Sequence, residues 1–181
     1  MVSGNVVAFQ KPGLKFESML VPTDGSALSI AAALKAVEFA KRLGVKIVAF
    51  HSIPAYRYPV YVGGIPFEYP SEEDYETQCC AIADRYLDLV VDAAGAQGVA
   101  AGTRTEFNSG TAQSIVEAAK REGCSLIFMG SHGRGGLSSV FLGSVTIKTL
   151  TLAHIPVIVD RPTTEDISEA EELMSQFSIE P

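Results

Sequence analysis

A glycine-rich stretch between residues 130 and 144 is the part of this sequence whose residue types and spacing best suit binding chemistry. Four of its first seven residues are glycine. Because glycine has no Cβ, the backbone amides of such a loop can approach a ligand closely and can take positive φ values. An apolar run precedes the stretch, and a helical pattern opens near Ser144. Amides that converge ahead of a helix N-terminus bind anions, so the expected guest is a phosphate group.

The glycine spacing distinguishes this loop from two common phosphate-binding motifs. A Walker loop needs a Gly-Lys pair, and the chain contains none. The dinucleotide fingerprint, counted from Gly133 and Gly135, needs glycine or alanine at the position that Ser138 occupies. The pattern that remains is Gly130-x2-Gly133-x9-Gly143-Ser144.

Regular elements must hold this loop in place, and the pattern ahead of it is clear. Residues 19–21 form a short strand-like run that the turn at 22–25 closes. Apolar residues with helical spacing follow, with Ser26 as the expected N-cap and Gly44 as the end of the helix. Further strands are predicted at 45–50, 99–107, 126–129 and 156–159, and further helices at 71–95, 111–123 and from about 144. The apolar stripe expected on the helix at 71–95 consists of Tyr75, Cys79, Ile82, Tyr86, Leu89 and Ala93.

Five strands alternating with four helices predict an α/β fold. The expected architecture is a doubly wound, open, five-stranded parallel sheet with helices on both faces. Ligands of such sheets bind beyond the carboxyl ends of the strands, where the strand order reverses. Asp24 follows the first strand and the glycine loop follows the fourth, so both are expected at this edge.

Composition excludes several classes of protein. The chain has 181 residues, 47% of them apolar, which is typical of one soluble globular domain. Its net charge of −7 argues against a nucleic-acid partner, which would need a basic face. No apolar stretch approaches the length of a membrane span, and the apolar run at 6–9 is too short for a signal peptide. A cytoplasmic location with no membrane partner is therefore expected.

The chain divides into a leader at 1–16, a nucleotide-binding domain at 17–162 and an acidic tail at 163–181. The tail holds six acidic residues and no basic one. Apolar residues at 167, 170, 174 and 177 would line one face of a short helix, and a frayed tail is the alternative. The 54–70 segment has four prolines and four tyrosines and is expected to be a long loop. Its tyrosines could close over a ligand as a lid, or could serve packing or an interface.

Several motifs along residues 17–161 resemble the universal stress protein family in the order in which they occur. The glycine pattern is similar to the G-x2-G-x9-G-[ST] motif of its ATP-binding members. The other matching segments are Val21-Pro22-Thr23-Asp24, the strand that ends at His51, Met129-Gly130-Ser131-His132-Gly133, Gly143-Ser144-Val145-Thr146 and Pro156-Val157-Ile158-Val159. The resemblance implies a Rossmann-like fold of the adenine nucleotide alpha hydrolase type.

The resemblance also implies that an adenine nucleotide, ATP or AMP, lies across the ends of the first and fourth strands. Asp24 would contact the ribose, and the main chain near Ser52 would contact the adenine. The whole implied nucleotide-binding set is Pro22, Thr23, Asp24, Ser52, Met129, Gly130, His132, Gly133, Arg134, Gly143, Ser144, Val145 and Thr146. Participation of Mg2+ is left open, and no residue is assigned to catalysis or to a protein-bound metal.

Each of these residues also has a structural interpretation. Asp24 could form an Asx turn ahead of Ser26, the glycines could be a flexible connector, and Arg134 could be a solvated surface residue. His51 and His154 are expected to be structural, and His132 is expected to offer backbone and packing rather than acid-base chemistry.

The glycine loop contains no carboxylate and no lysine, although fast phosphoryl transfer needs a placed metal and a group that orients the nucleophile. We therefore expect a stress-response sensor or regulatory protein with slow or no ATP hydrolysis. A weak ATPase is one alternative, and a dimeric scaffold that does not use a nucleotide is another. The resemblance implies a homodimer formed through the last strand, at Val157, Ile158 and Val159.

Overall fold

The computed structural model describes residues 15–58, 70–133 and 141–177. Most of the expected leader lies outside the described residues. The same is true of Arg134, of Ser138 and of Tyr61 and Tyr69 in the expected long loop.

Five strands and five helices make up the described chain. The strands are β1 (Ser18–Pro22), β2 (Lys46–Pro54), β3 (Ala101–Asn108), β4 (Leu126–Gly130) and β5 (Val157–Asp160). The helices are α1 (Ala27–Leu43), α2 (Glu72–Ala96), α3 (Thr111–Arg121), α4 (Ser144–Leu152) and α5 (Thr164–Gln176). All strand pairs are parallel, in the order β3-β2-β1-β4-β5. The predicted doubly wound parallel sheet is thus confirmed, with one helix more than expected.

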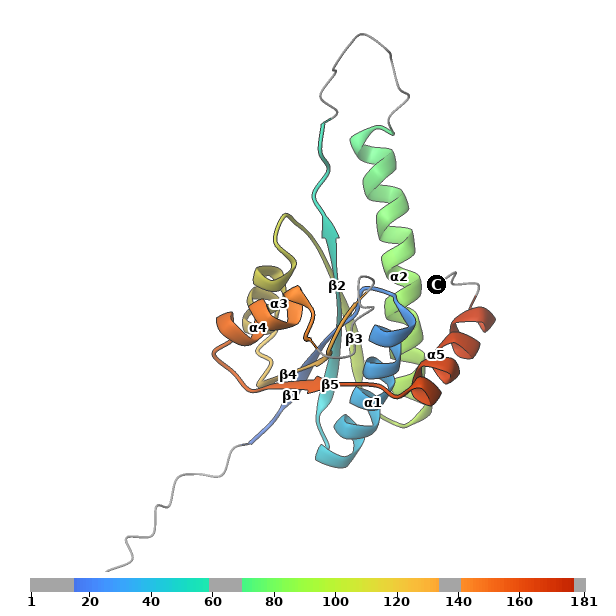
Figure 1. The fold of residues 1–181 in the computed structure, drawn as a ribbon, viewed down its shortest axis with the longest axis vertical. Coiled ribbons are helices and arrows are strands. Elements are labelled where there is room, and N and C mark those ends of the chain that lie inside the picture. Colours follow the sequence, from blue (N-terminus) through green and yellow to red (C-terminus); the bar gives the residue numbers. More distant parts are fainter. Residues whose placement is uncertain (1–14, 59–69, 134–140, 178–181) are drawn as a thin grey trace, which may run out of the picture.

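Helices cover both faces of this sheet (Figure 1). α1, α2 and α5 pack on one face, and α3 and α4 lie on the other. Successive side chains of a strand point to opposite faces, so β1 sends Met19 and Val21 into one core and Leu20 into the other. Burial on both faces explains why β1 and β4 read as continuous apolar runs in the sequence.

Helix α1 begins and ends where its local signals predicted. The Ser26 hydroxyl accepts a hydrogen bond from the Ser29 N–H at the N-cap. Gly44 has a φ of 67° and donates its N–H to carbonyl groups of the last turn. Both ends are set by residues within the helix and its caps, which is why the sequence alone located them.

The predicted apolar stripe of α2 is partly wrong. Ile82 is 41% exposed, and the buried residues of this helix begin only at Ala83. The first turns of α2 run beside the far end of β2 and extend beyond the other helices (Figure 1). They have little to pack against there, so helical spacing alone misjudged which residues are buried.

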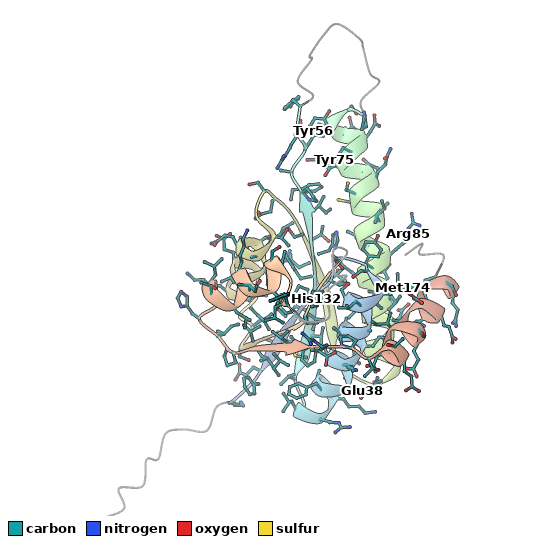
Figure 2. The ribbon with its side chains drawn as sticks, in the orientation of Figure 1. Glu38, Tyr56, Tyr75, Arg85, His132 and Met174 are labelled. Carbon is teal, nitrogen blue, oxygen red and sulfur yellow. The ribbon has the colours of Figure 1, made fainter. Side chains whose placement is uncertain are left out.

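Tyr56 and Tyr58, the described tyrosines of the expected loop, pack at this outer end. The Tyr56 ring lies 5.4 Å from that of Tyr75, and its hydroxyl donates to the Pro70 carbonyl. Figure 2 shows Tyr56 and Tyr75 together at the tip of α2, away from His132. Neither Tyr56 nor Tyr58 lines the cavity described below. In this structure Tyr56 packs against Tyr58 and Tyr75, Tyr58 is 73% exposed, and the lid stays a prediction.

The acidic tail forms a docked helix through Phe177, which settles the alternatives that the sequence left open. Ala170 and Met174 of α5 are fully buried in the core that α1 shares. The N-cap Thr163 and Asp166 form a capping box, and the Asp166 carboxylate lies 2.5 Å from the Lys35 Nζ of α1. Among the described residues, no helix is long and apolar enough to cross a membrane.

Candidate functional site

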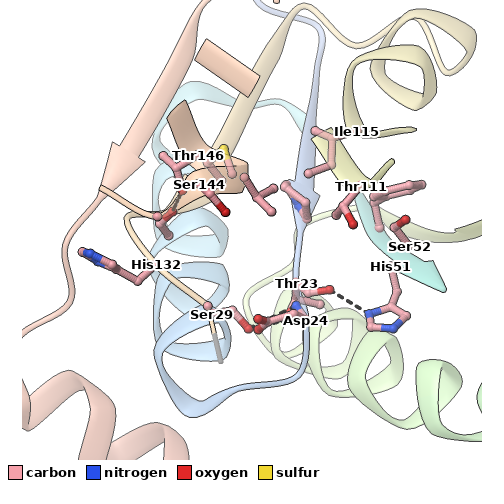
Figure 3. Close-up of a pocket in the computed structure, with 17 residues that line it drawn as sticks. Thr23, Asp24, Ser29, His51, Ser52, Thr111, Ile115, His132, Ser144 and Thr146 are labelled. Carbon is pink, nitrogen blue, oxygen red and sulfur yellow. Dashed lines mark hydrogen bonds between the residues drawn. The ribbon is translucent and has the colours of Figure 1, made fainter. Parts of the chain in front are cut away.

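A cavity of about 390 Å³ opens at the carboxyl ends of β1, β2 and β4 (Figure 3). β1 and β4 are neighbours in the sheet, and the strand order reverses between them. This is the point at which doubly wound sheets bind ligands, and the volume falls within the usual range for small-molecule sites. The lining residues are Pro22, Thr23, Asp24, Ser29, Phe50, His51, Ser52, Thr111, Ile115, Met129, Gly130, His132, Gly133, Gly143, Ser144, Val145 and Thr146.

Asp24 and Gly133 meet across this cavity. A Cβ added to Gly133 would stand 2.1 Å from Asp24 Oδ2, well inside contact distance. The other carboxylate oxygen, Oδ1, accepts hydrogen bonds from the Ser26 N–H (3.1 Å) and hydroxyl (2.6 Å). Asp24 therefore makes the Asx turn considered from the sequence and also faces the glycine loop. The Asx turn is present, and the ribose contact stays a prediction.

Thr23 fixes the backbone on which Asp24 is carried. Its N–H donates to the Phe50 carbonyl (2.9 Å), and its hydroxyl lies 2.8 Å from that of Ser29. Its carbonyl accepts a hydrogen bond from Nδ1 of His51 (2.8 Å). Because both main-chain groups and the side chain of Thr23 are held, the position of Asp24 is set before any ligand arrives.

The N-terminus of α4 forms the opposite wall. The N-cap is Gly143, whose N–H donates to the Ser131 carbonyl (2.8 Å), and no side chain among the described residues caps the helix. The first N–H groups of α4 lie on the side where Ser144 and Val145 line the cavity. The buried Thr146 hydroxyl lies 3.1 and 3.2 Å from the carbonyl oxygens of Gly130 and Ser131 and holds the loop against the helix.

Main-chain groups of β2 face the cavity where β1 has ended. The Lys46 N–H donates to Glu17 and the Phe50 carbonyl accepts from Thr23, so even-numbered residues of β2 turn their main-chain groups towards β1. The pairing of the two strands stops at Pro22 and Phe50. The N–H and C=O of Ser52 therefore point into the space beyond β1, as a donor beside an acceptor.

Apolar side chains line the cavity between Ser52 and α4. Phe50, Ile115 and Met129 belong to one buried cluster, and Val145 packs against it. These residues form a slot whose walls suit a flat apolar ring.

Twelve of the thirteen residues predicted from the resemblance line this one cavity, and Arg134 lies outside the described residues. His51, expected to be structural, does hold Thr23 and also lines the cavity. Sequence reasoning missed Ser29, Phe50, Thr111 and Ile115. Phe50 could have been found because it lies two residues before Ser52 and therefore on the same face of β2. Thr111 and Ile115 could have been found because they lie four residues apart, on one face of α3.

Comparisons with known proteins agree with this architecture. Residues 15–161 match the model of the universal stress protein family. The universal stress protein MJ0531 of Methanocaldococcus jannaschii is 31% identical over 148 residues, which cover 80% of this chain and 81% of the relative. YxiE of Bacillus subtilis is 31% identical over 150 residues, covering 81% and 99%. The chain spans about half the length (47%) of a mycobacterial relative that it matches, Rv2005c of Mycobacterium tuberculosis.

Solved structures share the fold. A universal stress protein family member from Burkholderia pseudomallei has a TM-score of 0.63 at 24% identity, over 82% of this chain and 98% of that one. A universal stress protein in complex with cAMP has a TM-score of 0.58 at 19% identity, over 82% and 99%. The Archaeoglobus fulgidus protein in complex with dAMP has a TM-score of 0.53 at 20% identity, over 80% and 98%. Family model, relatives and strand order agree, and the chain belongs to the universal stress protein family.

Proposed function

We propose that the cavity binds an adenine nucleotide. The observation that carries this proposal is the meeting of Asp24, Gly133 and the N-terminus of α4 around one space. A carboxylate suits the hydroxyl groups of a ribose, because it accepts their hydrogen bonds. The N-terminus of α4, which no described side chain caps, suits a phosphate, because the N–H groups of the first turn and the helix dipole both favour an anion.

The base would occupy the slot between Phe50, Ile115, Met129 and Val145. An adenine ring offers an acceptor beside an amino donor, and the main-chain N–H and C=O of Ser52 offer the complementary pair. Two related folds, found in complexes with cAMP and dAMP, support an adenine nucleotide as the ligand class. Whether AMP, ADP or ATP binds best, and whether Mg2+ accompanies it, are questions for titration.

The binding test uses the purified whole chain. Heating the protein and separating the supernatant by chromatography should release an adenine nucleotide, and the emptied protein should bind AMP or ATP with micromolar affinity. Three charge-assisted hydrogen bonds of about 1.5 to 3 kcal/mol each contribute about 5 to 9 kcal/mol, and burial of the base adds to this, against an association cost of about 4 kcal/mol or more. Asp24→Ala should weaken binding at least tenfold. Absence of any bound nucleotide, together with no binding at millimolar concentrations, would contradict the proposal and favour a scaffold.

We also infer a regulatory role in stress response, with slow or absent hydrolysis. Asp24 is the one carboxylate among the described lining residues, and its Oδ1 is held by Ser26. A regulatory protein should release phosphate from ATP at a rate near background, with or without added Mg2+. Turnover well above background that disappears in Asp24→Ala would identify an ATPase instead.

A homodimer through β5 is the assembly that we propose. β5 lies at one edge of the sheet, and its even-numbered side faces β4: the carbonyls of Pro156 and Asp160 accept hydrogen bonds from the N–H groups of Ile127 and Ser131. The N–H of Val159 therefore faces the open edge. Val159→Pro removes that donor without touching the β4 ladder and should yield a folded monomer in light scattering. A dimer that survives this change would place the interface elsewhere.

A further inference from the structure

Thr111 is a polar residue of the cavity that the proposed contacts leave unused. It is the first residue of α3, and Ile115, one turn later on the same face, also lines the cavity. In the part of the chain that the structure describes, the Thr111 hydroxyl has no hydrogen-bond partner. Thr111 is exposed, so this hydroxyl is available to a ligand.

Other polar groups at the start of α3 are directed elsewhere or have no side chain. The N-cap is Gly110, which contributes no capping side chain. The Ser114 hydroxyl is buried and donates to the Glu106 carboxylate (3.1 Å). Thr111 is therefore the side chain through which this end of α3 presents a hydrogen-bonding group to the cavity.

The position of Thr111 is at the base end of the cavity. Phe50 and Ser52 share the face of β2 that packs towards α3, because side chains alternate along a strand. Figure 3 shows Thr111 beside Ser52 and Ile115, whereas His132 and Ser144 lie across the cavity, where the phosphate is proposed to bind. A ligand that places its phosphate at α4 would bring its base to Thr111.

We infer that Thr111 is a base-binding residue that hydrogen-bonds the edge of the purine. This inference rests on the proposed nucleotide binding and adds a side chain to the main-chain contact of Ser52. The hydroxyl can donate to a ring nitrogen or accept from an exocyclic amino group. A base edge that loses this partner inside an apolar slot would bind roughly tenfold more weakly.

The test compares Thr111→Val with Thr111→Ser. Valine keeps the shape of threonine without the hydroxyl, and serine keeps the hydroxyl. Thr164→Val is the matched control, since Thr164 is also exposed and also the first residue of a helix, α5, outside the cavity. Binding of adenosine, AMP, ATP and GTP to each purified variant is measured by calorimetry, and melting temperatures establish folding. Thr111→Ala replaces Thr111→Val if the valine variant does not fold.

Thr111→Val should weaken the binding of adenosine, AMP and ATP by the same factor of about ten, because the three ligands share the base. The serine and Thr164 variants should match the wild type. Wild-type affinities in Thr111→Val, or a loss confined to the phosphate-bearing ligands, would overturn the inference while nucleotide binding stands. A wild-type protein that binds none of the four ligands would instead remove the proposed function, and the inference with it.

Discussion

Gly133 and Gly143 are two glycines of one loop with different constraints. A Cβ on Gly133 would collide with Asp24 Oδ2 at 2.1 Å, whereas a Cβ on Gly143 would approach His132 Cα and the Ser131 carbonyl at 3.3 Å. The first conflict requires Asp24 or the loop to move, and the second needs a shift of a few tenths of an ångström. The two glycines of the pattern therefore differ in how strictly the surrounding atoms exclude a side chain.

We expect Gly133→Ala to reduce AMP affinity at least tenfold, because it displaces the carboxylate proposed to hold the ribose. Gly143→Ala should have a smaller effect on affinity. Isothermal titration of both variants measures this, with Gly102→Ala on β3 as the control, since nothing lies within 4 Å of the added Cβ there. If Gly133→Ala binds AMP as tightly as the wild type, the position of the Asp24 carboxylate does not matter for ligand binding.

Cavity residues that belong to a local sequence motif could be predicted, whereas residues that strand pairing or helix packing brings to the cavity could not. Asp24 and Gly133 belong to recognisable motifs. His51 reaches Thr23 because β2 lies beside β1, and Thr111 reaches the cavity because α3 packs across the sheet end. Those placements depend on register and packing, which spacing along the chain does not encode.

At the level of elements, Gly44 and Gly95 show that a glycine at the end of a helix and a glycine inside one affect stability differently. Gly44 caps α1 with a φ of 67°, a region that disfavours side chains. Gly95 lies within α2 with nothing within 4 Å of an added Cβ. Gly44→Ala should lower the free energy of unfolding by about 1 kcal/mol, and Gly95→Ala should raise it by about 0.5 kcal/mol. Urea denaturation of both variants would reveal opposite shifts, and shifts of the same sign would contradict this account.

Helix termini were predictable where one residue and its near neighbours decide them, as Ser26, Gly44 and Ser71 do. The buried face of α2 was not, because its first turns extend beyond the other helices. The sequence left helix α5 open against a frayed tail, because its apolar residues Ala170 and Met174 are buried only by packing with α1, far away in the chain. A sequence pattern holds no record of such a contact.

For the whole molecule, the contact between α5 and α1 should depend on pH. Hydrogen bonds from Lys35 and Thr163 lower the pKa of Asp166 from 3.8 to about 2. A lowered pKa means that the ionised carboxylate stabilises the fold at pH values above 3.8, and that this contribution is lost as the pH falls towards 2. The hydrogen bond with Asp166 likewise raises the pKa of Lys35, so the amine keeps its charge throughout that range.

Asp166→Asn should therefore be less stable than the wild type at pH 6, and the difference should vanish as the pH approaches 2. Denaturation curves at several pH values measure it. The neighbouring Asp160, whose pKa is raised chiefly by burial, serves as the contrast. Asp160→Asn should be tolerated at pH 6, since ionised Asp160 gains less from Lys35 than burial takes away. A pH-independent effect of Asp166→Asn would contradict a stabilising role for the ionised carboxylate.

The early end of β1 has a consequence for how a ligand would be held. β2 and β3 continue side by side to Pro54 and Asn108, while β1 stops at Pro22 and leaves Ser52 facing open space. A flat ring docked there would lie beyond Thr23, where the chain turns away from β2, and would hydrogen-bond the main chain of Ser52 in place of a further strand residue. The ligand would thus replace a strand residue in the sheet, and its binding would rigidify the central strands rather than the outer loops.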